Sequence, residues 1–354
     1  RDFSLETVYQ IGRWLPHTMR KIDPDLIFPL KVLVGHDIRL SSNDIRTALC
    51  RGLIESGCNV DDMGLATTPM VYFFTAENSY DLSIQITASH NPAHHNGMKV
   101  SRRGALPVGY ANGLALLESK VASGQLPPLA ATPGTLRERS FLGEYVAWLR
   151  ERKADLTGLR FAIDCSNGMA GLFARQLFGN DAAYLNEVPD GNFPNHSPNP
   201  LEAASREQLS RYVREHNLDV GVIFDGDADR VMFVDEQGAF IQPDYLIPII
   251  ARHFLTTEPH AAVIHDVRTS RGAIEALQAD GARPVMGKVG HSFAKMLLRE
   301  SGAVCGGELA GHYYFREFFN CDSGILASLL VLHAVKTLKA QDQTIGSFID
   351  SIVT

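Results

Sequence analysis

The sequence lacks the features that would place the chain in a membrane, in an oxidising compartment or on nucleic acid. No apolar run approaches the roughly 18 residues of a membrane span, and Arg1 to Ser4 offer no apolar signal-peptide core. The five cysteines are scattered, odd in number and without CxxC spacing, which indicates a reducing compartment rather than disulfides or zinc. No run of Lys or Arg suggests a nucleic-acid face. We therefore expect a cytoplasmic protein with no nucleic acid and no membrane among its partners.

What the chain does contain is enough apolar material for several cores. It has 354 residues, 45% of them hydrophobic, which is too long for one ordinary domain and predicts two or three. The net charge is −7 and the sequence pI is near 6.0. An acidic balance of this size leaves room for a basic pocket that binds a small anion.

A single local pattern occurs three times at spacings of more than a hundred residues. An apolar strand, a polar turn that carries Asp and an amphipathic helix follow one another at Lys31 to Gly35, Leu159 to Asp164 and Ala262 to Asp266. Whole domains fit such spacings. We therefore predict an α/β protein of three tandem related domains, with mixed sheets flanked by helices.

The domain boundaries follow proline-rich stretches. Ser119 to Thr135, with Pro127-Pro128 and Pro133-Gly134, is predicted to be a linker, and Pro243 is predicted to open the last domain. The predicted domains are residues 1–135, 136–242 and 243–354. Further elements expected from periodicity are helices at Leu5 to Met19, Phe141 to Arg150 and Gly324 to Lys339, strands at Asp219 to Phe224 and Val231 to Val234, and a hairpin turn at Asp235 to Gly238.

The first candidate for chemistry is Ser89. It follows an apolar strand, Leu82 to Ile86, and precedes an abrupt turn at Asn91-Pro92. A serine at this position has its hydroxyl at the rim of a sheet, where reacting groups of α/β proteins are common. Ordinary turn chemistry is the alternative interpretation of the same residues.

The second candidate is an acidic loop between two apolar strands. Asp225, Asp227 and Asp229 alternate with the small residues Gly226 and Ala228, so the three carboxylates can converge on one hard cation. An EF-hand is excluded, because its loop needs Gly after the third acid and here an arginine follows directly. Without a cation, each pair of carboxylates would repel by roughly 4 kcal/mol at an effective dielectric of 20. A solvated acidic turn is the alternative.

Two further loops could bind a ligand. In Gly306 to His312, Glu308 can accept hydrogen bonds from sugar hydroxyls and His312 can donate to an oxyanion or phosphate, although a plain turn fits equally well. Lys288 and His291 flank Gly290 at a predicted helix start, where anions bind readily. A solvated helix terminus is the alternative there.

In order and spacing, these motifs resemble the α-D-phosphohexomutase superfamily, and within it the phosphomannomutase/phosphoglucomutase branch. The resemblance covers essentially the whole chain. The matching segments are Thr87-Ala88-Ser89-His90-Asn91-Pro92, Asn96-Gly97-Met98-Lys99, Asp225 to Arg230 and Gly307 to His312, with Asp190 to Pro194, Asn199-Pro200 and Lys288 to His291 in support of the branch.

The resemblance implies an intramolecular phosphotransferase. It would interconvert the 6-phosphate and 1-phosphate of mannose, and also of glucose, through a phosphoserine at Ser89. A hexose 1,6-bisphosphate would be both intermediate and activator, one Mg²⁺ would be bound per chain, and the protein would be a monomer or homodimer. A phosphoserine carries nearly two negative charges, so beside three aspartates it needs a divalent cation.

The roles implied by the resemblance fall on named positions. Lys99 and His291 are both candidates for the base that takes the sugar hydroxyl's proton. The implied catalytic residues are Ser89, Lys99, Arg230 and His291; the implied metal ligands are Ser89, Asp225, Asp227 and Asp229; the implied substrate-binding residues are His90, Glu308, Ala310, His312, Arg268 and Lys288.

The sequence also departs from the family pattern. Ala310 replaces the branch's usual serine and Arg268 an often-found lysine, so the sugar preference stays open. A phosphoglucosamine mutase and a catalytically silent sugar-phosphate-binding protein remain the alternatives. The family's N-terminal Gly- and Arg-containing segment and its fourth, C-terminal domain are absent from this sequence, so we expect it to bind metal but to turn over poorly.

Overall fold

The computed structural model describes residues 4–180 and 182–352. The chain divides into two compact units, Arg1–Ala88 with Pro92–Leu142, and Ser89–Asn91 with Gly143–Thr354. The first unit holds one six-stranded sheet, and the second holds two five-stranded sheets. Among the described residues, no helix combines the length and apolarity needed to cross a membrane.

The first unit consists of one sheet and the helices that cover it. Its strands are β1 (Lys31–His36), β2 (Asn59–Leu65), β3 (Leu82–Ile86), β4 (Met98–Arg102), β5 (Leu106–Pro107) and β6 (Leu136–Glu138). Its helices are α1 (Leu5–Ile22), α2 (Ser42–Glu55), α3 (Thr68–Glu77) and α4 (Ala115–Ala122), with a 3₁₀ turn η1 (Arg103–Ala105) and a π turn η2 (Tyr110–Leu114).

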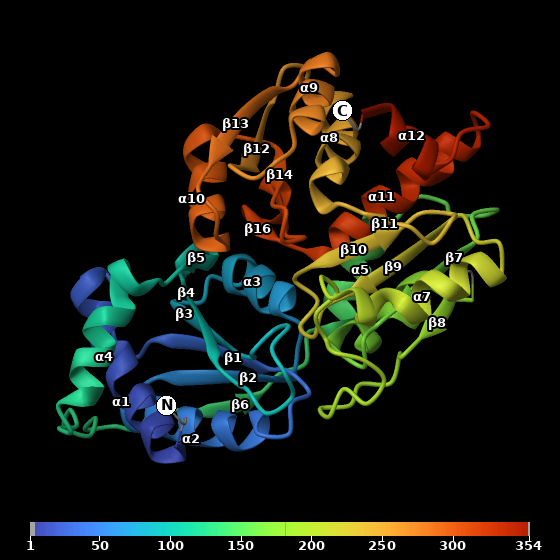
Figure 1. Ribbon diagram of the computed structural model, residues 1–354. Coiled ribbons are helices and arrows are strands. Elements are labelled where there is room, and N and C mark those ends of the chain that lie inside the picture. Colours follow the sequence, from blue (N-terminus) through green and yellow to red (C-terminus); the bar gives the residue numbers. More distant parts are fainter. Residues whose placement is uncertain (1–3, 181, 353–354) are drawn as a thin grey trace. The chain divides into compact units, whose positions relative to one another are not determined.

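Alternation along the strands explains how this sheet is covered. Val32 and Val34 of β1 point into the apolar core that α1 and α2 close, because successive side chains of a strand face opposite ways. On the other face, Ser83 of β3 accepts a hydrogen bond from Thr75 of α3 at 2.6 Å. Helices therefore lie on both faces, with α3 opposite α1 and α2 (Figure 1).

The second unit contains the remaining elements. Its strands are β7 (Phe161–Asp164), β8 (Ala182–Leu185), β9 (Val220–Phe224), β10 (Val231–Val234), β11 (Phe240–Ile241), β12 (Ala262–Asp266), β13 (Arg283–Gly287), β14 (Cys305–Gly307), β15 (Tyr313–Phe315) and β16 (Cys321–Asp322). Its helices are α5 (Leu142–Arg152), α6 (Ala174–Phe178), α7 (Ala203–Glu215), α8 (Leu246–Leu255), α9 (Arg271–Ala279), α10 (His291–Ser301), α11 (Gly324–Lys339) and α12 (Ile345–Ile352), with 3₁₀ turns η3 (Met169–Leu172), η4 (Pro243–Tyr245) and η5 (Arg316–Phe318).

The three sheets share one topology. Their orders are β5-β4-β3-β1-β2-β6, β11-β10-β9-β7-β8 and β13-β12-β14-β15-β16. In each sheet the first strand lies between the second and the third and is parallel to both, and two antiparallel strands follow the third. The predicted fold class, three related α/β units with mixed sheets, is therefore confirmed.

The helices of the second unit cover its two sheets. Leu209 and Val213 of α7 pack on one face of the β7 to β11 sheet. Helix α11 contacts β9 and β10 and also packs against α8, so it joins the two sheets of the unit (Figure 1). Lys336 and Lys339 of α11 strengthen this packing through ion pairs, with Asp155 and Asp219 respectively, both at 2.7 Å.

The repeated topology places the predicted sites at equivalent points. The loop after the third strand of each sheet carries Ser89 (after β3), Asp225 (after β9) or Glu308 (after β14). The first strands also end alike, because Asp37, Asp164 and Asp266 each accept from the backbone N–H two residues further along, at 3.0, 2.8 and 2.7 Å. These Asx turns are the polar turns that the sequence pattern indicated.

Most predicted elements agree with the structure to within a few residues, and the predicted linker at 119–135 forms no helix or strand after its first few residues. Residues 119–122 belong to α4, and the following segment is fixed to the first unit: Trp14 donates to the Gln125 carbonyl at 2.8 Å, and Arg13 to the Pro127 carbonyl at 2.7 Å. The domain boundaries at 135/136 and 242/243 stay a prediction. All five cysteines are buried, and none of them forms a disulfide.

Candidate active site

Ser89 lies in a strained backbone conformation at the edge of the acidic loop. Its φ is 51°, in the left-handed region that non-glycine residues adopt rarely and that is also found in several turns of this chain. The side chain is 9% exposed, and its Oγ donates to Asp225 Oδ2 at 2.7 Å. The tertiary structure thus brings together two segments 136 residues apart in the chain.

Three buried carboxylates gather beside this serine. Asp225, Asp227 and Asp229 are at most 2% exposed, and one oxygen of each lies within 4.8 Å of the others. Arg230 is the one cation in the same loop, so three negative charges face one positive charge. Burying an excess of charge is costly, and carboxylate oxygens are the ligands that Mg²⁺ prefers. The donor set therefore fits a hard divalent cation.

The acidic loop can approach Ser89 because Gly226 has no side chain. A Cβ at Gly226 would lie 2.5 Å from the Ser89 carbonyl oxygen, closer than real contacts allow. On the other side, the Met169 N–H donates to the Gly226 carbonyl at 2.9 Å. Ala228 turns the chain back with a φ of 61°. The small residues noted in the sequence thus serve close approach as well as curvature.

Arg230 is held inside the cluster. Its Nε donates to Asp225 Oδ2 at 3.1 Å, and the residue is 3% exposed. Burial by itself lowers the pKa of the guanidinium, but the charges of Asp225 and Asp229 outweigh burial and raise it. The arginine therefore stays a fixed positive charge next to the serine.

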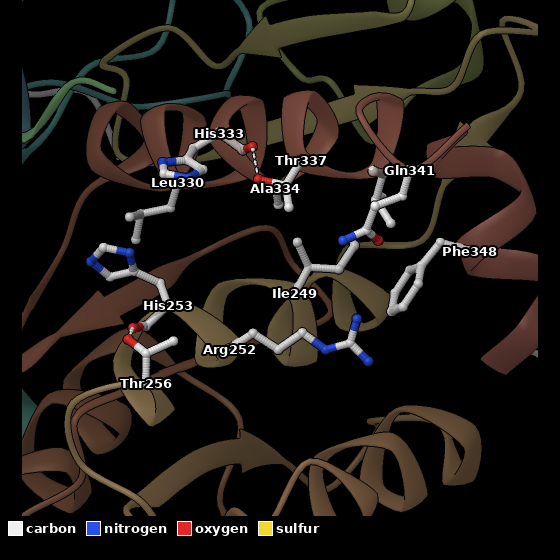
Figure 2. A pocket seen from close by; sticks show the side chains of 11 residues that line it. Ile249, Arg252, His253, Thr256, Leu330, His333, Ala334, Thr337, Gln341 and Phe348 are labelled. Carbon is white, nitrogen blue, oxygen red and sulfur yellow. Dashed lines mark hydrogen bonds between the residues drawn. The ribbon is translucent and has the colours of Figure 1, made fainter. Parts of the chain in front are cut away.

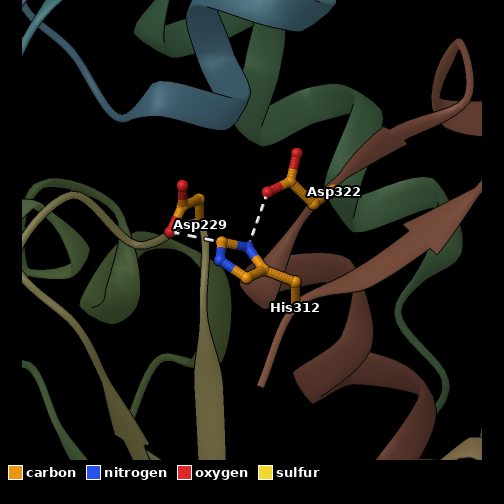
Figure 3. Close-up of side chains that lie close together, drawn as sticks. All are labelled: Asp229, His312 and Asp322. Atoms are coloured by element: carbon orange, nitrogen blue, oxygen red, sulfur yellow. Dashed lines mark hydrogen bonds and ion pairs between the residues drawn. The ribbon is translucent and has the colours of Figure 1, made fainter. Parts of the chain in front are cut away.

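His312 joins the third sheet's loop to the acidic loop. Its backbone forms an antiparallel bridge with Arg230, and its ring lies 6.2 Å from the His291 ring, centroid to centroid. Nδ1 is 2.8 Å from Asp322 Oδ2 and 3.9 Å from Asp229 Oδ1 (Figure 3). Burial alone lowers the pKa of His312, but the Asp229 charge and the Asp322 hydrogen bond outweigh burial and raise it.

The Glu308 carboxylate already accepts hydrogen bonds from two groups of the protein. It is 2% exposed, Oε1 accepts from the Gly290 N–H at 2.7 Å, and Oε2 accepts from the Tyr314 hydroxyl. In this conformation the carboxylate links the Gly307–His312 loop to the Lys288–His291 loop. A sugar hydroxyl would have to share or replace one of these donors.

The other predicted substrate-binding residues are more accessible. Arg268 is 40% exposed and pairs with Asp266 at 2.6 Å, and Asp266 also accepts from the Leu309 N–H at 3.2 Å. Lys288 is exposed, with Nζ 5.8 Å from the Phe293 ring centroid. Ala310 is partly exposed in the same loop as Glu308.

His90 and Lys99 flank Ser89 along the chain but belong to different units. His90 is half-buried next to the serine and lies in the second unit. Lys99 lies on β4 of the first unit, opposite Gln85 of β3. Arg39, which the sequence reasoning missed, holds the intervening loop by donating to the carbonyls of Pro92 (2.6 Å) and His95 (3.0 Å).

The structure adds three residues that the sequence reasoning did not single out. Asp322, Lys295 and Tyr314 are all fully buried, and they contact His312, Asp322 and Glu308 respectively. One signal was available for Lys295. It lies four residues after His291, on the same face of α10, and a lysine on a buried helix face needs a partner.

A cavity also lies elsewhere in the second unit. It has a volume of about 470 Å³ and opens between α8, α11 and α12 (Figure 2). Its arginine, Arg252, already pairs with Asp280 at 2.6 Å and lies 4.5 Å from the Phe348 ring centroid. The cavity therefore offers no unengaged guanidinium for a phosphate, and none of the predicted site residues lines it.

Comparison with known families matches nearly the whole chain. The profiles described as phosphoglucomutase/phosphomannomutase, alpha/beta/alpha domains I, II and III match residues 1–123, 141–238 and 242–353. Each matched range contains the strands of one sheet, except that the edge strands β6 and β11 lie just beyond the first two ranges.

Individual relatives agree with the profiles. A phosphomannomutase of Escherichia coli is 38% identical over 343 residues, which cover 93% of this chain and 73% of the relative. A protein of Xanthomonas campestris named phosphohexose mutases is 37% identical over 310 residues, which cover 86% of this chain and 69% of the relative. A crystal structure of a phosphoglucomutase/phosphomannomutase family protein from Burkholderia thailandensis superposes with a TM-score of 0.87 at 28% identity, covering 99% of this chain and 76% of that one.

Proposed function

Because the chain belongs to the phosphoglucomutase/phosphomannomutase family of the α-D-phosphohexomutase superfamily, we propose that it is a phosphohexose mutase, an isomerase, acting on mannose phosphate and also on glucose phosphate. It would interconvert the 6-phosphate and the 1-phosphate. One observation carries the proposal: Ser89 Oγ lies 2.7 Å from a carboxylate of a buried three-aspartate cluster.

Ser89 is proposed to carry the transferred phosphoryl group. In the first half-reaction the bond between Oγ and phosphorus breaks while phosphorus bonds to a free sugar hydroxyl, which loses its proton to a base. The sugar then holds two phosphoryl groups. In the second half-reaction the other one returns to Ser89, so the 1,6-bisphosphate is both intermediate and activator. Lys99 and His291 remain the candidates for the base.

Asp225, Asp227 and Asp229 are proposed to hold one Mg²⁺ together with a phosphoserine oxygen. When bound, Mg²⁺ neutralises charge on the transferring group. Arg230 adds a fixed positive charge, since the carboxylates beside it raise its pKa and keep it protonated.

The third sheet is proposed to recognise the sugar phosphate. Glu308 would accept from sugar hydroxyls in place of the Gly290 N–H, so substrate binding would loosen the Lys288–His291 loop. Arg268, Lys288 and His90 offer positive charge or N–H donors to phosphate oxygens, and His312 can donate from Nε2 only when its ring is protonated. Ala310 supplies no hydroxyl in the loop where the branch usually has one, and this leaves the sugar preference open.

The proposal extends to partners and location. Its partners are small-molecule sugar phosphates, and it acts as a monomer or homodimer in the cytoplasm. A phosphoglucosamine mutase is the alternative within the same chemistry. A sugar-phosphate-binding protein without catalytic activity is the alternative in another functional class. The strained serine beside three buried carboxylates favours a catalytic role over binding alone.

The test compares three substrates on the same protein. Mannose 1-phosphate, glucose 1-phosphate and glucosamine 1-phosphate are supplied with Mg²⁺ and a trace of the matching bisphosphate, and Ser89→Ala is the control. We expect slow turnover of the first two sugars and none by the variant. Intact mass before and after phosphatase treatment should show one phosphoryl group on the wild type and none on Ser89→Ala.

The outcomes separate the alternatives. Turnover of glucosamine 1-phosphate alone would favour the amino-sugar mutase. A protein that never carries a phosphoryl group at Ser89 and turns over none of the three sugars would refute the mutase proposal.

A further inference from the structure

His312 is held by a carboxylate that the predicted roles do not use. Asp322, on β16, lies 2.8 Å from His312 Nδ1 through its Oδ2. Asp322 is fully buried, whereas the His312 side chain is 14% exposed. The imidazole Nδ1 therefore faces the buried Asp322 carboxylate, and Nε2, on the other side of the ring, does not.

The same carboxylate has a cation on its second oxygen. Lys295 Nζ lies 2.8 Å from Asp322 Oδ1, and both side chains are fully buried. Lys295 comes from α10, the helix that begins with His291. Asp322 therefore connects the helix that carries one predicted active-site histidine to the loop that carries the other.

This arrangement fixes where the ring proton sits. An ionised carboxylate can only accept hydrogen bonds, so the nitrogen facing Asp322 must carry the hydrogen. Lys295 beside the other oxygen keeps the carboxylate ionised despite its burial. A neutral His312 then carries its proton on Nδ1, which leaves Nε2 as an acceptor for a proton or hydrogen bond.

A metal ion at this point fits less well. Asp229, His312 and Asp322 have ligand atoms within 4.8 Å of one another, as a metal site would require. Asp322 already has Lys295 as its counter-ion, however, and Arg230 Nε lies 4.0 Å from Asp229. A second divalent cation would meet two fixed positive charges.

We propose that Asp322, with Lys295 as its counter-ion, is a positioning residue that holds His312 in the Nδ1-protonated tautomer and turns Nε2 toward the substrate. The inference rests on the proposed mutase function for its kinetic consequence, and on geometry alone for the tautomer. It assigns Asp322 a role that acts through His312 rather than on the sugar phosphate.

The experiment combines NMR with kinetics on the full chain. Histidine-selective ¹⁵N labelling with long-range proton correlation distinguishes the two tautomers, and His312→Gln identifies the signal. At a pH where the ring is neutral, we expect the Nδ1–H tautomer in the wild type. In Asp322→Asn the amide can turn its NH₂ toward Nδ1, so the proton should move to Nε2.

The kinetic arm measures kcat and KM with mannose 1-phosphate. We expect Asp322→Asn to lower kcat about 10- to 100-fold, the range for partners that orient a functional histidine, with KM little changed. Because Asp322→Asn leaves Lys295 buried without its anion, the double variant Lys295→Met/Asp322→Asn removes both charges and should show the same loss in kcat. Asp280→Asn, which breaks an exposed pair with Arg252, is the matched control and should leave kcat unchanged.

Two results would overturn the inference. One is an Nε2–H tautomer of His312 in the wild type; the other is a kcat within twofold of wild type in both Asp322 variants. A wild-type chain that turns over no hexose phosphate refutes the proposed function instead, and the tautomer in wild type and Asp322→Asn then decides the positioning role by itself.

Discussion

At the scale of single residues, the candidate site depends on one backbone approach. The acidic loop and the Ser89 backbone meet where Gly226 has no side chain. The serine's own strained φ of 51° persists only if the surrounding structure holds it. The geometry of the serine is therefore set by its neighbours more than by its own turn sequence.

Gly226→Ala should damage the site more than the fold. The new Cβ would lie 2.5 Å from the Ser89 carbonyl oxygen, so either Ser89 or the acidic loop must move. Because a misplacement of about 1 Å can cost on the order of 10²-fold in rate, we expect that loss in kcat, with a destabilisation of about 1–3 kcal/mol. Kinetics and denaturant unfolding measure the two effects.

The matched control is Gly143→Ala. No atom lies within 4 Å of a Cβ at Gly143, which is near the start of α5. Its stability should change by less than about 1 kcal/mol and its kcat not at all. Equal rates for Gly226→Ala and wild type would contradict the proposed close approach.

His196 provides a pH-dependent contribution to stability. Its Nε2 lies 3.0 Å from Asp164 Oδ2 and the side chain is 7% exposed. Burial alone lowers the pKa of His196, but the hydrogen bond and charge of Asp164 outweigh it and raise the pKa above 6.5. The folded protein therefore binds this proton more tightly than the unfolded chain, so the contribution is complete below about pH 6.5 and is lost as pH rises through the folded pKa.

We accordingly expect His196→Gln to cost about 1.5–3 kcal/mol at acidic pH, typical of a hydrogen bond to a charged group, and less at alkaline pH. Urea unfolding at about pH 5.5 and about pH 8.5 measures the difference. His216→Gln, at the exposed end of α7, is the control. A larger loss of stability at alkaline pH than at acidic pH would contradict a raised pKa of His196 in the folded protein.

At the scale of elements, the N-terminus of α11 supports the acidic loop. A Cβ at Gly324 would lie 2.8 Å from the Arg230 carbonyl carbon, so the helix begins directly against the loop. Ser323 caps the helix by accepting from the Leu326 N–H at 3.1 Å, and it is fully buried. The cap therefore stabilises the helix and, through it, the wall of the site.

Ser323→Ala should destabilise the second unit by up to about 2 kcal/mol, the upper range for a lost cap, because the Leu326 N–H is left without its acceptor in a buried position. Ser4→Ala removes the equivalent cap of α1 at an exposed site, where water can replace the hydroxyl, and should cost less. Thermal unfolding compares the two variants. Equal losses would mean that burial of the cap does not matter.

At the scale of the whole molecule, three sheets share one topology, and the loop after the third strand of each sheet carries a predicted site residue. The chain's excess of negative charge includes three buried aspartates, which repel one another strongly in the folded state and far less in the unfolded chain. Folding should therefore be coupled to binding of a divalent cation.

Mg²⁺ at about 100 times its Kd should stabilise the protein by about 2.7 kcal/mol, and EDTA should reverse the shift. Asp227→Asn should abolish the Mg²⁺ effect while being at least as stable as wild type without metal, because one repulsive charge is gone. Asp342→Asn, at an exposed turn, should behave like wild type. Scanning calorimetry with and without Mg²⁺ measures these shifts. A full Mg²⁺ shift in Asp227→Asn would exclude this loop as the site.

The sequence by itself determined the fold class and the family, and both predictions are confirmed. The fold class followed from apolar strands, Asp turns and amphipathic helices, which are local signals that repeat three times, and the family followed from the resemblance of the ordered motifs around Ser89, Asp225 and Glu308. It also located the serine, the aspartates and the glycines between them. The predicted linker at 119–135 is irregular after α4 but packs on the first unit, because proline-rich composition indicates a lack of regular structure and not a lack of packing.

Only the tertiary structure decided which distant groups meet. Asp322 precedes a helix cap, and Lys295 lies on the buried face of α10, which indicates that it needs a partner but not which one. The pairing of Lys295 with Asp322, the pairing of Asp322 with His312, and the hydrogen bonds from Gly290 and Tyr314 to Glu308 depend on how α10, β15 and β16 pack. Local pattern sets each element, but burial forces charged and polar groups to find partners across elements, and those partners follow from packing alone.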